Sequence, residues 1–138
     1  MTVEKLSQLR YLKHEIEVER ERLLELRRLS EYGEQRMDGT PRANGKSDRV
    51  SRFAIELTYL EQLIAEQMQW AVCELLRLQK FINDIEDSEL RLIFYYRYIK
   101  CLGWKTVAFR MGKHDEQLPR KKHDRYLKML AEKQGKDS

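Results

Sequence analysis

The chain has 138 residues, of which 36% are charged, 41% are hydrophobic, six are glycine and two are proline. This composition is typical of a soluble, strongly helical protein and excludes a disordered or membrane-bound chain. No apolar run approaches the roughly 18–20 residues that cross a bilayer, and the first residues lack the apolar core of a signal peptide. The sequence therefore predicts a cytoplasmic protein without a membrane partner.

The net charge of +4 is distributed unevenly along the chain. Residues 97–138 hold 12 Lys and Arg against 5 Asp and Glu, a net charge of +7, whereas residues 1–96 hold 15 against 18, a net charge of −3. So much positive charge in the C-terminal third predicts an acidic or polyanionic partner, of which DNA is the commonest, although basic tails also serve solubility.

Residues 2–32 carry one long helical pattern. Apolar side chains recur at spacings of three and four along it, at Leu9, Leu12, Ile16, Leu23 and Leu26. This spacing is typical of a helix that packs against another helix, and Glu19 occupies one position of the seam. Residues 33–47 interrupt the pattern with glycine, proline and asparagine, which predicts a linker.

A second long helical pattern begins at Ser47 or Asp48, either of which is a good N-cap. Its apolar seam consists of Val50, Phe53, Leu57, Leu60, Ile64, Ala71, Leu78, Phe81 and Ile85. At about 1.5 Å per residue this helix is on the order of 50 Å long, too long to bury the seam in a compact globule. The sequence therefore predicts an antiparallel partner helix in residues 2–32, a second subunit in a homodimer, or both. Trp70 lies off the seam.

Three shorter helical patterns follow, the first of them with Asp87 or Ser88 as its candidate N-cap. A turn separates the last two, where Gly112 can adopt the positive φ that ends a helix and Asp115 can cap the next one. A helix, a short turn and a basic helix are typical of a helix-turn-helix. We therefore expect an all-α fold.

The expected all-α fold has two parts. A long helical hairpin, or coiled coil, over residues 1–86 is predicted to oligomerise, and a helix-turn-helix domain over residues 87–138 is predicted to bind DNA.

The last helix separates its side chains into two faces. An inward face is predicted for Pro119, His123, Tyr126 and Leu130, and an outward face for Gln117, Lys121, Asp124 and Lys128. Because Gln, Arg and Lys side chains donate to base edges and phosphates in a major groove, the outward face predicts binding of double-stranded DNA. The predicted DNA-binding residues are Lys105, Lys113, Gln117, Arg120, Lys121, Asp124, Arg125 and Lys128.

These residues have different predicted roles. Gln117, Arg120 and Lys121 are expected to read base edges, whereas Lys105 and Lys113, nearer the turn, are expected to contact phosphate. Asp124 has two open interpretations, since it can accept a hydrogen bond from cytosine or orient a neighbouring arginine. Trp104 and Tyr126 are expected to hold the two helices of the motif together.

The C-terminal 45 residues resemble the fourth, promoter-reading region of bacterial sigma factors. The matching positions are Arg97-Tyr98-Ile99, Gly103-Trp104, Val107-Ala108, Met111-Gly112 and the closing Tyr126-Leu127-x-x-Leu130. With its long helical N-terminal half, the whole chain is similar to phage-encoded regulators of the ArpU/RinA kind. Those are associated with late-gene transcription in phages and prophages of Gram-positive bacteria. The resemblance implies a transcriptional regulator that acts in a bacterial host cell, with RNA polymerase as a candidate further partner.

Nothing in the sequence indicates catalysis, a metal or another cofactor. No nucleophile–base pair stands out, and the histidines lack zinc-type spacing. Cys73 and Cys101, each within a helical pattern, are predicted to be reduced structural thiols. Two other classes stay open: a small terminase-like DNA-packaging protein and a structural coiled-coil adaptor with an incidental basic end. A dimer favours regulation and a large ring favours packaging, whereas salt-dependent DNA binding excludes the adaptor.

Overall fold

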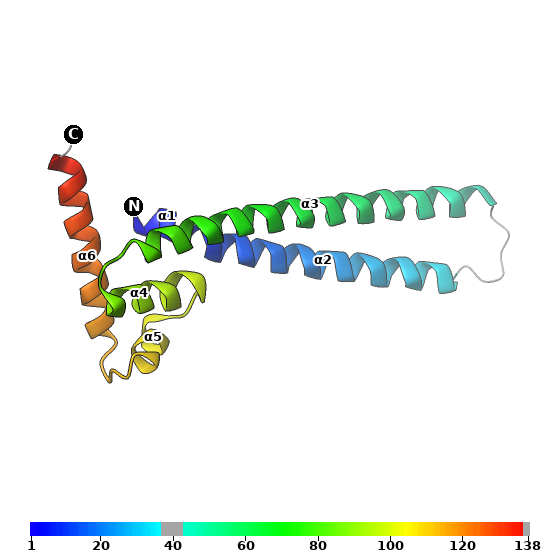
Figure 1. Cartoon of the computed structure of the whole chain (residues 1–138). Helices are drawn as coiled ribbons and strands as arrows, with labels where there is room; N and C mark the ends of the chain where they lie inside the picture. Colours follow the sequence, from blue (N-terminus) through cyan, green and yellow to red (C-terminus); the bar gives the residue numbers. More distant parts are fainter. Residues whose placement is uncertain (37–42, 137–138) are drawn as a thin grey trace. The chain divides into compact units, whose positions relative to one another are not determined.

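The computed structural model describes residues 1–36 and 43–136, and within these ranges it is helical and contains no strand (Figure 1). The helices are α1 (Val3–Leu6), α2 (Gln8–Arg36), α3 (Ala43–Asn83), α4 (Ser88–Phe94), the π-helix η1 (Tyr95–Ile99), α5 (Trp104–Arg110) and α6 (Gln117–Lys136). The prediction of an all-α protein is therefore confirmed.

The predicted single helix over residues 2–32 is divided at Ser7. The backbone N–H of Ser7 donates to the Val3 carbonyl over 2.9 Å, and its hydroxyl donates to the same carbonyl over 2.7 Å. The Ser7 hydroxyl thus competes with its own N–H for one carbonyl, which weakens the helix at this point. At the start of α1, the Thr2 side chain accepts from the Lys5 N–H. A new helix begins directly afterwards.

The predicted linker over residues 33–47 is wrong at both ends. Helix α2 continues to Arg36, and α3 begins at Ala43 rather than at Ser47 or Asp48. A glycine inside a helix costs only about 1 kcal/mol relative to alanine, which a long helix tolerates. The remaining linker residues, 37–42, lie outside the described part of the chain.

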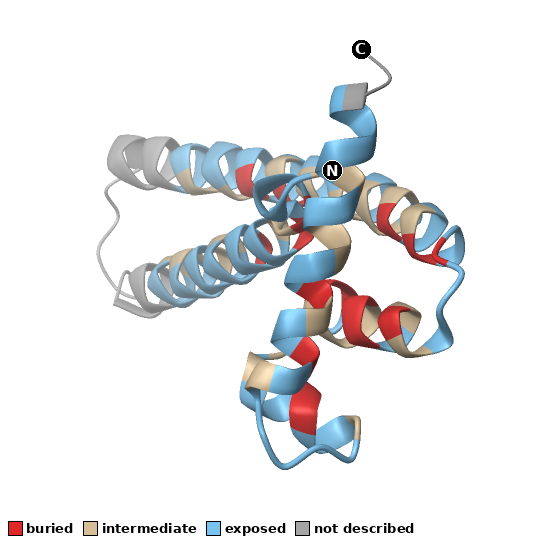
Figure 2. Ribbon diagram, turned by 90° about the vertical axis from the view of Figure 1, so that its left-hand side faces the viewer, coloured by how far each residue is buried: buried red, intermediate tan, exposed pale blue. Residues whose placement is uncertain are grey.

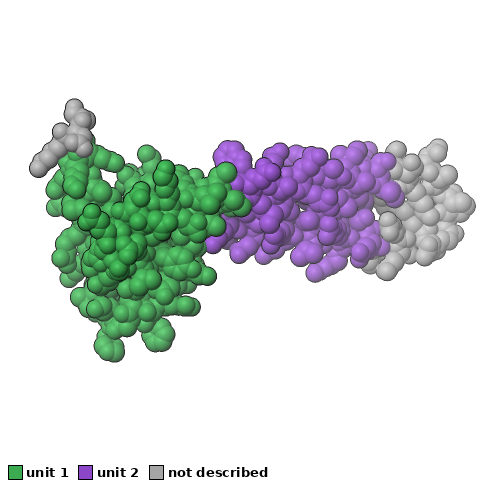
Figure 3. All heavy atoms as spheres, in the orientation of Figure 1, with its two compact units in different colours: residues 1–11, 71–138 green, residues 12–70 purple. Residues whose placement is uncertain are grey.

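The chain forms two compact units, which Figure 3 shows in different colours. The first unit joins Met1–Tyr11 to Ala71–Ser138, and the second consists of Leu12–Trp70. The ends of the long helices nearest the C-terminal helices thus belong with them in one unit. The predicted functional boundary between residues 86 and 87 stays a prediction.

The core of the first unit is apolar and aromatic (Figure 2). Its buried members are Leu6, Leu9, Leu78, Ile82, Ile85, Leu90, Phe94, Tyr98 and Ile99. Phe94 is fully buried, and its ring centroid lies 5.9 Å from that of Phe81, 5.6 Å from Tyr98 and 5.7 Å from Tyr126. These rings bring α3, the α4–η1 segment and α6 together around one side chain.

Two local features fix the start and end of the α4–η1 segment. Asp87 is the N-cap of α4, because its carboxylate accepts from the backbone N–H groups of Glu89 and Leu90. After η1, Cys101 adopts a φ of 59°, which a residue with a Cβ adopts at some cost. Cys101 therefore lies in a turn and not within a helix as predicted. Its thiol and that of Cys73 are free.

The second unit is an antiparallel helical hairpin, as predicted. Pairs across it run in opposite chain directions: Gln67 donates to Glu15 over 3.3 Å, and Arg27 pairs with Glu61 over 2.9 Å. Ile16, Leu60 and Ile64 form its buried seam, with Leu12, Leu23, Leu26, Phe53 and Leu57 half-buried beside them. Val50, predicted to belong to the seam, is instead 52% exposed.

Replacing the central ring tests this account of the first unit. Phe94→Ala should lower the free energy of unfolding by about 3–5 kcal/mol, because it removes buried surface and leaves a cavity. Phe109→Ala is the matched control, since Phe109 is 82% exposed and should change stability by less than about 0.5 kcal/mol. Urea unfolding followed by circular dichroism measures both. Equal midpoints for the two variants would contradict the assigned core.

Candidate nucleic-acid interface

The connection between α5 and α6 is a hydrogen-bonded turn. At the end of α5, Gly112 has a φ of 70°, and the Lys113 N–H donates to the Ala108 carbonyl over 2.8 Å. At the start of α6, the Asp115 carboxylate accepts from the Gln117 N–H over 3.0 Å. Both predicted roles, the left-handed glycine and the aspartate cap, are confirmed. The turn fixes the position at which α6 begins.

The inward face of α6 is held by a buried histidine. His123 is 2% exposed, and its Nε2 lies within hydrogen-bond distance of the Tyr98 hydroxyl. Its Nδ1 lies 2.8 Å from an oxygen of the Asp124 carboxylate. Since an ionised carboxylate only accepts hydrogen bonds, Nδ1 carries the proton, and Tyr98 donates to Nε2. Burial lowers the pKa of His123 although Asp124 opposes this shift, and burial raises the pKa of Tyr98 to about 12.

Aromatic rings surround this imidazole on several sides. The ring of Trp104, on α5, lies edge-on to it at a centroid distance of 4.8 Å, and the ring of Phe94 lies at 5.0 Å. Trp104 therefore connects α5 to α6, as predicted. Tyr126 instead packs edge-on against Phe94 of α4, so it connects α6 to a different helix from the one predicted. The imidazole and its neighbours fix the rotation of α6 about its own axis.

The opposite face of α6 is exposed and basic. Residues Gln117, Lys121, Asp124 and Lys128 follow the spacing of a single helix face. Among the predicted DNA-binding residues, Gln117 is half-buried and the others are exposed: Lys105, Lys113, Arg120, Lys121, Asp124, Arg125 and Lys128. Lys105 lies near the start of α5 and Lys113 in the turn, so the predicted set spans three consecutive segments.

Asp124 has a partner that the sequence analysis did not name. Its carboxylate is bound to His123, where the prediction named cytosine or a neighbouring arginine. Its side chain is 62% exposed and also adds a negative charge to the basic face. Asp124 is therefore part of the support of the histidine, and this assignment needs no nucleic acid.

Lys122 differs from the two cations before it. Its ammonium pairs with Asp87 over 2.9 Å and with Glu89 over 3.0 Å, which attaches α6 to the start of α4. The hydrogen bond between Lys122 and Asp87 raises the pKa of the lysine, and the hydrogen bond to Glu89 adds to this effect. The Lys122–Asp87 bond also lowers the pKa of Asp87. Arg120 and Lys121, by contrast, form no ion pair with any described residue.

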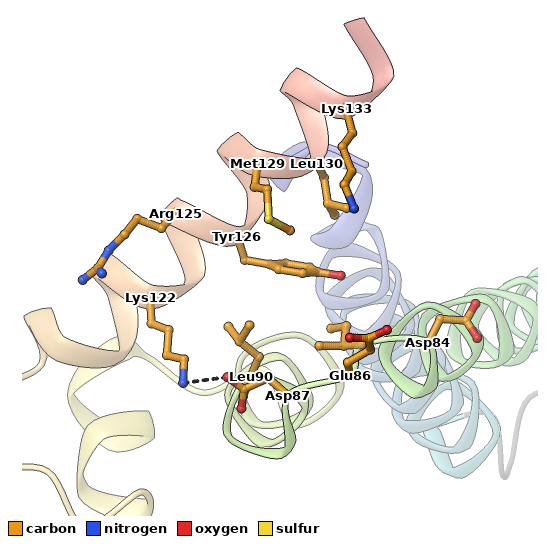
Figure 4. A pocket seen from close by; sticks show the side chains of 11 residues that line it. Asp84, Glu86, Asp87, Leu90, Lys122, Arg125, Tyr126, Met129, Leu130 and Lys133 are labelled. Atoms are coloured by element: carbon orange, nitrogen blue, oxygen red, sulfur yellow. Dashed lines mark hydrogen bonds and ion pairs between the residues drawn. The ribbon is translucent and has the colours of Figure 1, made fainter. Parts of the chain in front are cut away.

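A pocket of about 490 Å³ lies beside this ion pair, between α6 and the segment that leads into α4 (Figure 4). Leu90, Tyr126 and Met129 are among its apolar lining residues. Figure 4 shows the Lys122–Asp87 pair at one side of it, while the Arg125 side chain extends away from Tyr126. Arg125 also belongs to the pocket's lining, and its side chain is exposed.

Two arginines extend the positive charge beyond the predicted set. Arg97 donates to the Leu102 carbonyl over 3.0 Å, and its guanidinium lies 4.8 Å from the centroid of the Trp104 ring. Burial lowers the pKa of Arg97, and the charges of Arg10 and Arg120 act in the same direction. Arg10, in the N-terminal segment, therefore adds to the positive electrostatic potential at Arg97. No periodic pattern in the sequence links positions so far apart.

The structure and the comparisons add three negative findings. The described residues include no cluster of three or more His, Cys, Asp or Glu that could hold a metal ion. No helix in the same residues combines the length and apolar character needed to cross a membrane. Comparison of the chain with protein-family models, curated proteins and solved structures found no match.

The buried histidine generates a prediction about pH. The unfolded chain takes up a proton on His123 near its ordinary pKa of 6.5, whereas the folded state resists protonation. The free energy of unfolding should therefore fall as the pH drops below about 6.5. Urea midpoints at pH 7.5, 6.5 and 5.5 measure this loss. His123→Gln should be less stable at pH 7.5 but lose less on acidification, and equal losses in both proteins would refute the assignment.

Proposed function

We propose that this protein binds double-stranded DNA with sequence preference through α6 and regulates transcription in a bacterial host cell. The observation that carries the proposal is the division of α6 into a locked inward face and a free basic outward face. Arg120, Lys121, Arg125 and Lys128 are exposed and form no ion pair with a described residue. Lys122 of the same helix is, by contrast, held in ion pairs with Asp87 and Glu89.

The dimensions and chemistry of α6 suit a DNA groove. An α-helix fits the major groove of B-DNA, and the residues near the N-terminus of a recognition helix reach base edges. In α6 these are Gln117, Arg120 and Lys121, all within its first two turns. Gln can bond adenine and Arg or Lys can bond guanine, so this set can read a mixed sequence.

The flanking cations suit phosphate contacts. Lys105 lies near the start of α5 and Lys113 lies in the turn between α5 and α6, and both are exposed. Such contacts fix the register of a protein on a duplex without reading its sequence. The half-buried Arg97 is held by the Leu102 carbonyl and the Trp104 ring. We therefore expect it to add to the positive potential near the DNA rather than to contact a phosphate directly.

The regulatory part of the proposal rests on the resemblance to sigma-factor region four and to phage regulators of the ArpU/RinA kind. It makes late genes of phages or prophages the candidate targets, a homodimer the candidate active form, and RNA polymerase a candidate partner. A packaging role through a large ring is the competing outcome, and measurement of the subunit number distinguishes it.

Selection from a random duplex library tests the proposal. We expect a sequence motif to emerge, and Arg120→Ala or Lys121→Ala should cost roughly 1–3 kcal/mol on the selected site and relax preference at one position. Lys105→Ala and Lys113→Ala should weaken binding to all sequences and lower the salt slope by about one unit each. Lys80→Ala, which removes an exposed lysine from α3, is the control.

Two results would refute sequence-specific binding. One is the absence of any motif in the selected pool. The other is a Lys121→Ala variant whose affinity changes no more than that of Lys80→Ala. Thermal unfolding of each variant shows whether a loss of binding reflects loss of the fold. Both lysines are exposed, so neither substitution should lower the melting temperature much.

A further inference from the structure

The hairpin of the second unit leaves large apolar side chains outside its seam. Tyr59 is 60% exposed and Trp70 is 69% exposed, and Val18 and Leu29 of α2 are also exposed. Aromatic side chains are enriched at protein interfaces, where they supply large buried areas at low entropic cost. Single exposed apolar side chains are normal on a protein surface, whereas a contiguous group of them marks an interaction site. The question is therefore whether these side chains lie together.

The exposed aromatics fall on a single face of α3. Tyr59, Leu63, Glu66 and Trp70 are spaced at i, i+4, i+7 and i+11, which places them along one stripe of the helix. The seam residues Leu60 and Ile64 occupy the neighbouring stripe. Leu63 is half-buried, between the seam and this exposed stripe.

Helix α2 contributes a matching stripe. Val18, Arg22, Glu25 and Leu29 have the same i, i+4, i+7 and i+11 spacing. The hydrogen bond from Gln67 to Glu15 shows which side of the hairpin this stripe lies on. Trp70 is three residues after Gln67 on α3, and Val18 is three residues after Glu15 on α2. Both stripes therefore lie on the side of the hairpin where Gln67 meets Glu15. This surface, formed by the two stripes, is the aromatic side of the hairpin.

The opposite side of the hairpin is different. There Arg27 pairs with Glu61 over 2.9 Å, and an Nη atom of Arg20 lies 3.9 Å from the Met68 sulfur. Its exposed apolar side chains, such as Leu24 and Met68, are aliphatic, whereas those of the aromatic side include Tyr59 and Trp70.

We propose that the aromatic side of the hairpin is the contact surface for a second copy of this chain, so that two hairpins form a four-helix bundle. The inference deepens the proposed homodimer by assigning its interface, and to that extent it rests on the proposed function. An interface of this kind is isologous, with the same surface supplied by both copies.

The charges on the aromatic side favour a second copy of the chain over a polyanion as its partner. The two stripes carry Arg22, Glu25 and Glu66, and Arg52 lies two turns before Tyr59 on the same stripe of α3. Arg22 already lies 3.3 Å from Glu19, and Glu25 lies 3.8 Å from Arg28. The two cations and two carboxylates of the stripes nevertheless leave no net charge there, so a second copy meets no like-charge repulsion. A polyanion such as DNA would need a net positive surface, which the aromatic side lacks.

The available area also suits a dimer. Residues 52–70 of α3 extend for roughly 27 Å at 1.5 Å per residue, and two packed helices are roughly 20 Å wide. The face therefore offers on the order of 500 Å² per copy, or about 1,000 Å² in the pair, close to the lower limit for a specific interface. An aromatic centre is consequently needed for stable association.

Sedimentation velocity at about 20 µM protein is the decisive measurement. The wild-type protein should sediment as a dimer of the 16.7 kDa chain, and Trp70→Glu and Tyr59→Glu should each weaken the dimer at least tenfold, about 1.4 kcal/mol. Met68→Glu places the same charge on the opposite side of α3 and should leave the dimer intact. Circular dichroism of each variant monitors helix content.

A milder variant protects the test against loss of the fold. Trp70→Gln introduces an uncharged polar side chain that a helix accommodates well, and it should also weaken dimerisation. A wild-type monomer, a ring larger than a dimer, or a dimer that resists both Trp70→Gln and Tyr59→Glu would overturn the inference, as would a Met68→Glu variant that dissociates as readily as they do.

Binding of the Trp70→Glu variant to DNA separates this inference from the proposed function. A monomeric variant that still prefers the selected half-site, with lower affinity for the full site, supports both proposals. A dimer that depends on Trp70 but selects no DNA motif supports the interface alone. A sequence-specific protein whose subunit number does not respond to Trp70 supports DNA recognition alone.

Discussion

The burial of His123 is the constraint on which the orientation of α6 depends. A neutral imidazole is bonded at both nitrogens, to Tyr98 and to Asp124, and it lies against the rings of Phe94 and Trp104. A helix held at one such point cannot rotate without leaving a buried polar group unpaired, which is costly. The basic face is consequently exposed because the histidine face is buried. Packing of the inward face thus determines which charged side chains of α6 reach the solvent.

The sequence was sufficient for features that depend on neighbouring residues. Periodic apolar positions identified the hairpin, and local chemistry identified the Asp87 and Asp115 caps and the glycine turn at Gly112. Helix ends were less predictable. Glycine and asparagine weaken a helix without ending it, and so α2 extends beyond Gly33 and α3 begins before Gly45.

Features that depend on residues far apart in the chain could not be read from spacing. Lys121 and Lys122 are adjacent and chemically identical, yet only Lys122 meets Asp87 and Glu89. The difference arises from a rotation of about 100° between consecutive helix positions, combined with the placement of α4. The field of Arg10 on Arg97 has the same origin, since only the folded chain brings positions 10 and 97 together. Counting charges along a segment therefore overstates the number available to a partner.

The Asp124 carboxylate has a consequence for how well a protein of the proposed kind would discriminate its site from other DNA. Its bond to His123 fixes a negative charge on an otherwise basic face. Along any duplex that charge repels the nearest phosphate, which shortens the residence time on DNA of random sequence. At a preferred site, base contacts by neighbouring side chains compensate for the repulsion. If the protein binds DNA as proposed, the carboxylate that orients the histidine therefore lowers the affinity for random sequence more than the affinity for the preferred site.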